Sequence, residues 1–509
     1  MPADTPSTSR YLEVERKFDV GESTSSPSFA GIADVLRVER LPTQALDAVY
    51  YDTSARDLAS RRITLRRRTG GDDAGWHLKL PAGPDTRTEV RAPLGTANGS
   101  EEDGHEDVPT ELLDVVLAIV RDRPLNPVAR ITTTREVQEL YGADDAALAE
   151  FCNDQVTASR AATADAPEVE QRWREWELEL VQPAANAELM DKLSDRLLGA
   201  GAKPAGHGSK LARVLGTRPK DLAAGAADRL HRAVAEQLDV LLVWDRAVRA
   251  EADDAVHQMR VTTRRIRSLL RASPDSFGLS DDTSILDELR ELANVLGEAR
   301  DAEVLAERYR GALDKLPPTL ARGPIQDRLI DGAEERYRAG IRHSLAVMRS
   351  PRYFRLLDAL EAVVATTPPT DQGSGPVAVA AAAKKVRKAA KAARRASHED
   401  RDEALHRIRK RAKRLRYTAA AVGANKVAKR AKKVQSLLGD HQDCVVSREH
   451  LTEQADAAHA ATEDAFTYGL LYQQDSDLAR ESRQQLQPAL RKLFKALRKQ
   501  NRRGGRAGL

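Results

Sequence analysis

Residues 11–18, with the sequence YLEVERKF, decide how the first half of the chain is interpreted. In a β-strand, side chains alternate between the two faces, so Glu13, Glu15 and Lys17 share one face and apolar side chains take the other. Two carboxylates about 7 Å apart along a strand repel each other unless positive charge lies between them. The pattern therefore indicates a divalent metal ion together with an anionic ligand.

The composition limits the class of protein. The chain has 509 residues, more than one hydrophobic core usually serves, so two or three domains are expected. Charged residues make up 31% and aromatic residues 4%, which favours long charged helices in part of the chain. Because 81 Lys and Arg nearly balance 77 Asp and Glu, local clusters matter more than the net charge of +4.

Cysteine content and hydropathy predict a cytoplasmic protein. The two cysteines, Cys152 and Cys444, lie far apart without ligand spacing around them, which argues against a disulfide framework and against a zinc site. No apolar run is long enough to span a bilayer, and residues 1–10 are polar without the apolar core of a signal peptide. We therefore expect no membrane partner.

Strand signals continue after the first stretch. Seven further stretches alternate polar and apolar residues, and short turns join most of them, which predicts about eight antiparallel strands. These stretches are residues 48–52, 63–68, 76–80, 86–92, 128–140, 147–158 and 173–181. We also expect a short helix over residues 29–36, and a helix followed by a linker between residues 199 and 224.

Charged rows on these strands indicate the architecture. On any single strand such a row can simply face solvent, as in a sheet packed on a core. Eight strands with both signs of charge in repeated rows fit a closed barrel with a polar lumen better, with basic rows clasping phosphates and acidic rows holding metal. The rows are Thr64, Arg66 and Arg68; His77 and Lys79; Arg87, Glu89 and Arg91; and Glu175, Glu177 and Glu179.

The order of these motifs resembles the CYTH, or triphosphate tunnel metalloenzyme, family. The match runs from Glu-x-Glu-x-Lys through the Arg-x-Arg, Trp-x-Leu-Lys and Arg-x-Glu strands to a late Glu-x-Glu and to Ser209-Lys210. The resemblance implies an α+β fold: an antiparallel eight-stranded tunnel barrel with flanking helices. It also implies metal-dependent hydrolysis of inorganic triphosphate or short polyphosphate, with Mg²⁺ or Mn²⁺ as cofactor.

The resemblance also implies roles for individual residues. At Arg91 family members often carry a second acidic residue, so the number of metal ions and the preferred substrate stay open. The implied catalytic residues are Glu13, Glu15 and Lys17; the implied metal ligands are Glu13, Glu15, Asp154, Glu177 and Glu179; and the implied substrate-binding residues are Arg66, Arg68, Lys79, Arg87, Arg135 and Lys210.

The second half is helical and repeats itself. Residues 257–267 match residues 406–416, an offset of 149, and residues 296–301 match residues 438–443 in the same order. Two matched blocks in one order indicate duplication of a helical unit.

The expected domain organisation follows from this repeat and from the Gly-, Ala- and Pro-rich segment before it. Helix breaks are expected at residues 273–274, 316–318 and 366–376. The predicted parts are a tunnel domain at 1–216, a linker at 217–227, and an all-α domain of two duplicated helical bundles at 228–509, with copies at about 228–365 and 377–509.

Each copy carries a row of cations on one helical face. A His and three basic residues stand at i, i+3, i+7 and i+10, within an arc of about 80°. Like charges at this spacing destabilise an isolated helix, so another group has to compensate. Both copies resemble the CHAD domain, which is known as a family for binding inorganic polyphosphate and is a familiar fusion partner of CYTH. The implied polyphosphate-binding residues are His257, Arg260, Arg264 and Arg267 with His406, Arg409, Lys413 and Arg416.

Other interpretations stay open at this point. One alternative is a protein that binds polyphosphate without turnover, and another is an enzyme whose substrate is thiamine triphosphate or a nucleotide, as elsewhere in the CYTH family. The basic run at 384–395 is as consistent with a solvated helix face as with a binding surface. Nucleic acid suits the charge, but the basic helices have scarcely any aromatic residue to stack bases apart from Tyr417. A cytoplasmic protein associated with polyphosphate granules would fit the polyphosphate hypothesis.

Overall fold

The computed structural model divides into two compact units, Met1–Lys220 and Asp221–Leu509, which are described separately. The described residues are 9–83, 85–94, 107–160, 169–181, 187–217, 219–221, 223–224, 226, 229–271, 274–279, 284–365, 374–397 and 399–504.

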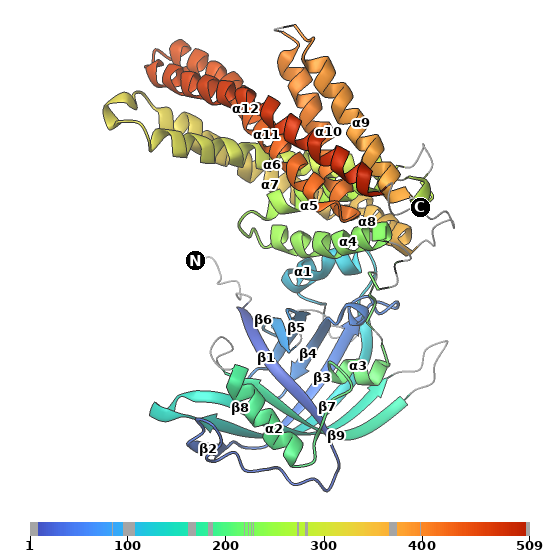
Figure 1. Cartoon of the computed structure of the whole chain (residues 1–509). Coiled ribbons are helices and arrows are strands. Elements are labelled where there is room, and N and C mark those ends of the chain that lie inside the picture. Colours follow the sequence, from blue (N-terminus) through green and yellow to red (C-terminus); the bar gives the residue numbers. More distant parts are fainter. Residues whose placement is uncertain are drawn as a thin grey trace. The chain divides into compact units, whose positions relative to one another are not determined.

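The first unit is a closed antiparallel barrel of eight strands, which confirms the predicted architecture (Figure 1). The sheet runs β1-β6-β5-β4-β3-β7-β8-β9, and β9 pairs with β1 to close it. Two short strands, β2 (Arg37–Arg40) and β10 (Lys203–Pro204), extend the edges of β7 and β1. The barrel strands are β1 (Ser9–Val20), β3 (Gln44–Asp52), β4 (Thr64–Thr69), β5 (Gly75–Pro81), β6 (Thr86–Ala92), β7 (Asn126–Tyr141), β8 (Ala147–Arg160) and β9 (Val169–Leu180).

The apolar rows of the strands pack outward against helices, which leaves the lumen to the charged rows. On β5, Trp76 and Leu78 are buried with the apolar side of α1 (Thr110–Val120). On β9, Trp176 and Leu178 pack with α2 (Ala187–Gly199), whose buried leucines recur every four residues. Burying one such leucine contributes roughly 2 kcal/mol. The period-two alternation therefore sends the residues between them inward.

The helix expected over residues 29–36 is wrong. The chain there forms turns, and Gly31 and Ala33 have positive φ angles of 78° and 50°, which a right-handed helix does not allow. The apolar residues of the segment serve the core instead, since Phe29 is buried and its ring lies 4.9 Å from that of Phe151. A short helix, α3 (Lys210–Leu215), does follow within residues 199–224; Ser209 caps it by accepting from the Ala212 N–H.

The described residues of the second unit form helices joined by turns and short loops, with no strand among them. In each half, a helix with the cationic row packs against a longer one: α5 against α6, and α10 against α11. The longer helices also pair with their successors, α6 with α7 and α11 with α12 (Figure 1). The helices are α4 (Arg229–Arg249), α5 (Ala255–Leu270), α6 (Ile285–Leu313), α7 (Gly332–Met348), α8 (Pro351–Ala365), α9 (Ser374–Ala393), α10 (Arg401–Ala421), α11 (Asn425–Ala460) and α12 (Phe466–Gly504). Of the expected break at 366–376, residues 366–373 lie outside the described part, and α9 already begins at Ser374.

Candidate functional site

A polar cavity of about 300 Å³ lies inside the barrel. The sequence-predicted residues that line it are Glu13, Glu15, Lys17, Arg66, Arg68, Lys79, Arg87, Arg135, Glu177, Glu179 and Lys210. Asp154, the remaining predicted metal ligand, is fully buried beside it and is bonded to Arg135 and Lys210. Seven barrel strands, counting β8 with Asp154, and the start of α3 thus bring together residues that lie up to 197 positions apart, from Glu13 to Lys210.

Lys17 is held between two carboxylates. Its Nζ lies 2.6 Å from Glu15 Oε2 and 2.5 Å from Glu177 Oε1. Burial by itself would lower the pKa of Lys17, but Glu15 and Glu177 outweigh it and raise that pKa above its usual value. Burial likewise opposes the ionisation of Glu15, yet Lys17 and Lys79 lower its pKa to about 2. Both groups therefore carry charge at neutral pH.

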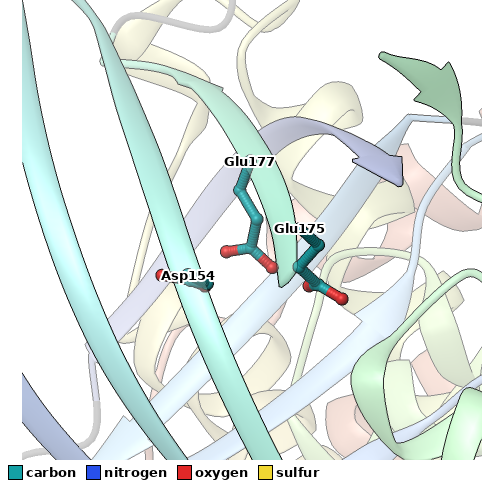
Figure 2. A group of neighbouring side chains, drawn as sticks. All are labelled: Asp154, Glu175 and Glu177. Carbon is teal, nitrogen blue, oxygen red and sulfur yellow. The ribbon is translucent and has the colours of Figure 1, made fainter. Parts of the chain in front are cut away.

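A second cation lies within a group of three carboxylates. Asp154 on β8 and Glu175 and Glu177 on β9 present oxygens within 4.8 Å of one another, a spacing that can hold a metal (Figure 2). Lys210 Nζ, however, lies 2.8 Å from Asp154, 2.8 Å from Glu175 and 2.6 Å from Glu177. A metal ion could enter this group only if the ammonium moved away.

Arg135 neutralises the same carboxylates from β7. Its Nη2 lies 2.7 Å from Asp154 Oδ2 and 2.6 Å from Glu177 Oε2. Although burial works against ionisation, Lys210 and Arg135 lower the pKa of Asp154, and Lys17 and Lys210 lower that of Glu177. These two predicted metal ligands therefore already have positive partners.

The remaining carboxylates have too few positive partners. Glu179 faces Glu15 across β1 and Glu150 across β8. Burial, and then the Glu13 carboxylate, raise the pKa of Glu179 to about 8. Glu13 bonds to Lys79 Nζ at 2.5 Å through one oxygen, whereas its other oxygen is buried with no hydrogen-bond partner among the described residues. An excess of buried carboxylate oxygens fits the ligand set that Mg²⁺ or Mn²⁺ requires.

Two arginines of β4 form the basic side of the cavity. The Nε groups of Arg66 and Arg68 are buried, and neither has a hydrogen-bond partner in the described part of the chain. Burial, together with Arg66 and Arg135, lowers the pKa of Arg68 to about 9, which shows how much positive charge is concentrated here. Buried cationic donors without partners are costly, so this wall is suited to anionic oxygens.

Sequence reasoning missed several residues of the tunnel. Tyr50 accepts a hydrogen bond from Arg66 Nη1 at 3.3 Å, and Asp73, from the turn after β4, lines the cavity. Glu150 lines the cavity as well. Glu175 was predicted as a member of the acidic row with Glu177 and Glu179, but it was not among the implied metal ligands. Nothing local to Asp73 or Tyr50 points to the tunnel.

The central members of the two cationic rows converge where α5 meets α10. Burial, then Arg264 and Arg409, lower the pKa of Lys413 to about 6. Burial and nearby cations also lower the pKa values of His257 and His406. His406 Nδ1 and Arg409 Nε are buried without hydrogen-bond partners among the described residues. The central residues of the two copies thus form one positively charged surface, in which the nearest neighbours of Lys413 are other cations.

The ends of the rows are arranged differently. Arg267 Nε donates to the carbonyl of Leu286 at 2.9 Å, and Arg267 lines a separate basic cavity with Arg271 and Arg414. Arg416 donates to Gln435 Oε1 at 3.2 Å and lies over the Tyr417 ring. These two predicted residues thus make contacts outside the central cluster, although Arg416 also helps to lower the pKa of Lys413 and Arg267 that of Arg264.

In each copy the two repeated sequence blocks lie on helices that pack against each other. The first block lies on α5 or α10, and the second lies on α6 or α11. On α6, a Cβ at Gly297 would lie 3.2 Å from Arg260 Nε, and on α11 a Cβ at Gly439 would lie 3.6 Å from Arg409 Nε. Glycine at these positions thus leaves room for each guanidinium against the facing helix. Arg260 Nη2 also lies 3.8 Å from Asp301, the last residue of its block.

The fold and the site define a class of protein: a triphosphate-tunnel barrel joined to a duplicated helical domain. The CYTH domain model matches residues 12–203, and the CHAD domain model matches residues 232–452. Uncharacterized proteins from two strains of Mycobacterium tuberculosis are 63% identical over 517 residues, which covers 98% of this chain and 99% of theirs. The chain belongs to the CYTH–CHAD fusion proteins.

Solved structures resemble each half separately. The CHAD domain of the plant Ricinus communis is 25% identical over 51% of this chain and 91% of its own, with a TM-score of 0.40. PptA from Streptomyces chartreusis is 20% identical over 52% of this chain and 99% of its own, with a TM-score of 0.42. HpAC1 from Hippeastrum, a putative adenylyl cyclase described with a dominant triphosphatase activity, is 15% identical over 40% and 96% of the two chains, with a TM-score of 0.24. Separately, no helix in the described ranges has the length and apolar character needed to cross a membrane.

Proposed function

We propose that the barrel hydrolyses inorganic triphosphate or a short polyphosphate in a metal-dependent reaction. One observation carries the proposal: a single cavity holds an excess of carboxylates around Glu13 and Glu179 and, across from them, the buried and incompletely paired guanidinium groups of Arg66 and Arg68. Carboxylate oxygens without a cationic partner suit a divalent metal. Guanidinium N–H groups without an anionic partner suit phosphate oxygens.

In this mechanism Glu13, Glu15 and Glu179 would hold the metal. The chemistry that a divalent metal would supply there is polarisation of the terminal phosphoryl group and activation of a water molecule. Positive charge alone would bind substrate and product about equally, so rate enhancement needs interactions that strengthen in the transition state.

The basic residues hold and orient the phosphates. Arg66 and Arg68 would present guanidinium donors to the departing pyrophosphate, and Lys79, which lines the same cavity and is bonded to Glu13, would add a third cation. Lys17 keeps its proton because Glu15 and Glu177 raise its pKa, so it acts as a hydrogen-bond donor to a phosphate oxygen rather than as a base.

We further propose that the helical unit binds polyphosphate through the convergent residues of α5 and α10. Arg suits this role because its planar guanidinium can hold two phosphate oxygens at once. The supporting observation is that burial and neighbouring cations lower the pKa values of both Arg264 and Lys413. Association with cytoplasmic polyphosphate granules would follow from such binding.

A second candidate substrate is an organic triphosphate such as thiamine triphosphate or a nucleotide. A neighbouring cavity of about 420 Å³ shares Thr64, Arg87 and Ser209 with the tunnel. Its other walls include the apolar residues Ile63 and Leu211, so it has the size and lining to take an organic group attached to the phosphate chain.

The test of the tunnel is phosphate release by the full chain from triphosphate, longer polyphosphate, ATP and thiamine triphosphate. Each substrate is assayed with Mg²⁺, with Mn²⁺ and with excess chelator. Hydrolysis of inorganic triphosphate that stops in chelator supports the proposal. Binding of polyphosphate without any phosphate release would favour a non-catalytic binding protein.

The test of the helical unit compares two fourfold alanine variants of the full chain. Titrations with long-chain polyphosphate and with duplex and single-stranded DNA are made at equal phosphate concentration and physiological salt. The first variant should lose most polyphosphate binding and the second should keep it; equal or tighter binding of DNA by the wild type would favour a nucleic-acid surface. The first replaces Arg260, Arg264, Arg409 and Lys413, and the matched control replaces the exposed Lys384, Lys391, Arg394 and Arg395.

A further inference from the structure

The turn between β4 and β5 brings a carboxylate into the tunnel. Asp73 lines the cavity and forms an ion pair with Arg68, and Arg91 Nη2 lies 3.9 Å from the same carboxylate. Asp73 is 33% exposed, so it reaches inward from the rim, whereas Arg68 is only 6% exposed. Among the cavity carboxylates, Asp73 comes from a turn and not from a barrel strand.

The surrounding structure fixes this turn in place. Gly70 and Gly71 both have positive φ, and a Cβ at Gly70 would overlap the carbonyl oxygen of Ala45, so the backbone lies tightly against β3. On the other side, His77 Nε2 lies 2.9 Å from the backbone oxygen of Asp73. The position of the Asp73 carboxylate over Arg68 is therefore determined by the fold.

The spacing of residues along β4 gives the distance between the level of Glu13 and the rim of the tunnel at Asp73. Thr64 pairs with Lys79, whose ammonium bonds Glu13, whereas Arg68 at the far end of the strand pairs with Gly75. Four residues of strand separate these two levels, or about 13 Å. A phosphate chain that starts at Glu13 therefore passes Arg66 before it reaches Arg68 and Asp73.

We propose that Asp73 limits the length of the phosphate chain that the tunnel accepts, an inference that rests on the function proposed above. A triphosphate extending from Glu13 past Arg66 meets the unpaired Nε of Arg68 and leaves the Arg68–Asp73 ion pair, which Arg68 forms through Nη2, in place. A longer chain brings further phosphates against the Asp73 carboxylate and has to displace it from Arg68. Like charges in a partly buried site repel strongly, so each added phosphate costs binding free energy at this rim.

The experiment compares the wild-type full chain with three variants at the turn. Asp73→Asn removes the charge but keeps the shape, Asp73→Glu keeps the charge, and Asp72→Asn removes an equal charge from the exposed neighbour. Calorimetric affinities in excess chelator, and kcat/KM with metal, are measured for linear inorganic tri-, tetra- and pentaphosphate. Because the helical unit is identical in all four proteins, differences between them report on the tunnel.

Asp73→Asn should improve affinity and kcat/KM for tetra- and pentaphosphate about tenfold relative to triphosphate, which corresponds to roughly 1.4 kcal/mol. Asp72→Asn and Asp73→Glu should keep the wild-type preference. An equal gain for all three chains, or weaker binding because Asp73 merely positions Arg68, would overturn the inference while leaving the proposed function standing. A wild type that neither binds nor hydrolyses any of the three would refute both.

Discussion

The ammonium nitrogen of Lys210 lies 2.6 Å from a carboxylate oxygen of Glu177. Lys210 opens α3, and Glu177 lies on β9, so this ion pair ties the helix to the barrel wall. The same nitrogen contacts Asp154 and Glu175, which places a side-chain cation where the geometry would otherwise suit a metal ion. The tunnel thus separates an acidic group that Lys210 neutralises from a second one at Glu13 and Glu179, where burial and the Glu13 carboxylate raise the pKa of Glu179.

Removing this lysine should make stability depend on metal. Lys210→Met leaves three buried carboxylates with less positive charge, which should lower the free energy of unfolding by about 3 kcal/mol. Mg²⁺ can then enter the vacated group and recover part of that loss, whereas wild type should respond less. Thermal unfolding with Mg²⁺ and with chelator measures both effects. The same Mg²⁺ response in both proteins would contradict the assignment of Lys210 as the resident cation.

Neutralising Glu13 or Glu15, two of the three proposed metal ligands, should abolish turnover without abolishing substrate binding. Glu13→Gln and Glu15→Gln remove ligand charge but keep the side-chain volume, and the arginines that hold phosphate are untouched. Phosphate release should fall at least about a thousandfold, in line with the loss of a preorganised electrostatic contribution, while calorimetry still detects triphosphate.

Glu22→Gln, which changes an exposed glutamate on the loop after β1, serves as the control and should behave as wild type. Full activity in both tunnel variants, or full wild-type activity in excess chelator, would refute the metal-dependent mechanism.

Polyphosphate binding should be coupled to the protonation of Lys413. Burial, then Arg264 and Arg409, lower the folded pKa of Lys413 from 10.5 to about 6, so the free protein holds this amine largely neutral at pH 7. A bound polyanion offsets the repulsion and favours the charged amine, so binding should take up a proton above pH 6 and weaken as pH rises. Calorimetry in buffers of different ionisation enthalpy measures the uptake.

Lys413→Arg provides the control, because arginine stays charged throughout this range and should remove most of the proton uptake. The same shift affects stability in the free protein. Between pH 6 and 10.5 the unfolded chain holds a proton on Lys413 that the folded chain lacks, so this residue makes stability rise with pH across that window. Equal proton uptake on polyphosphate binding by wild type and by Lys413→Arg would mean that groups other than Lys413 take up the proton.

The two helix glycines should respond unequally to alanine. In a helix interior, Gly→Ala usually stabilises by up to about 1 kcal/mol. At Gly439 the added methyl group meets Arg409 at ordinary contact distance, so Gly439→Ala should show that gain and keep polyphosphate binding. At Gly297 the contact with Arg260 is tighter, so Gly297→Ala should gain less stability and bind polyphosphate more weakly. Thermal unfolding and titration of both variants measure this, and identical behaviour would contradict the stated role of Gly297.

The sequence by itself determined the local patterns. Period-two alternation placed Glu13, Glu15 and Lys17 on one face of β1, and Glu177 and Glu179 on one face of β9. The reason is that successive side chains of a strand point to opposite faces. The recurrence of two blocks revealed the duplicated helical unit in the same way, since helix periodicity sets which residues share a face. The helix expected over 29–36 failed because left-handed backbone at Gly31 and Ala33 overrides an apolar pattern.

Only the tertiary structure decided which charges meet. Closure of the barrel through β1 and β9 sets Glu179 opposite Glu15, while α3 delivers Lys210 to Asp154 and Glu177 across 56 and 33 residues of chain. No local pattern can distinguish the carboxylates that Lys210 neutralises from those around Glu13 and Glu179. The pKa of each carboxylate depends on partners that folding brings from other strands. The place of Asp73 over Arg68 has the same origin, since it depends on how tightly the turn at Gly70 packs against β3.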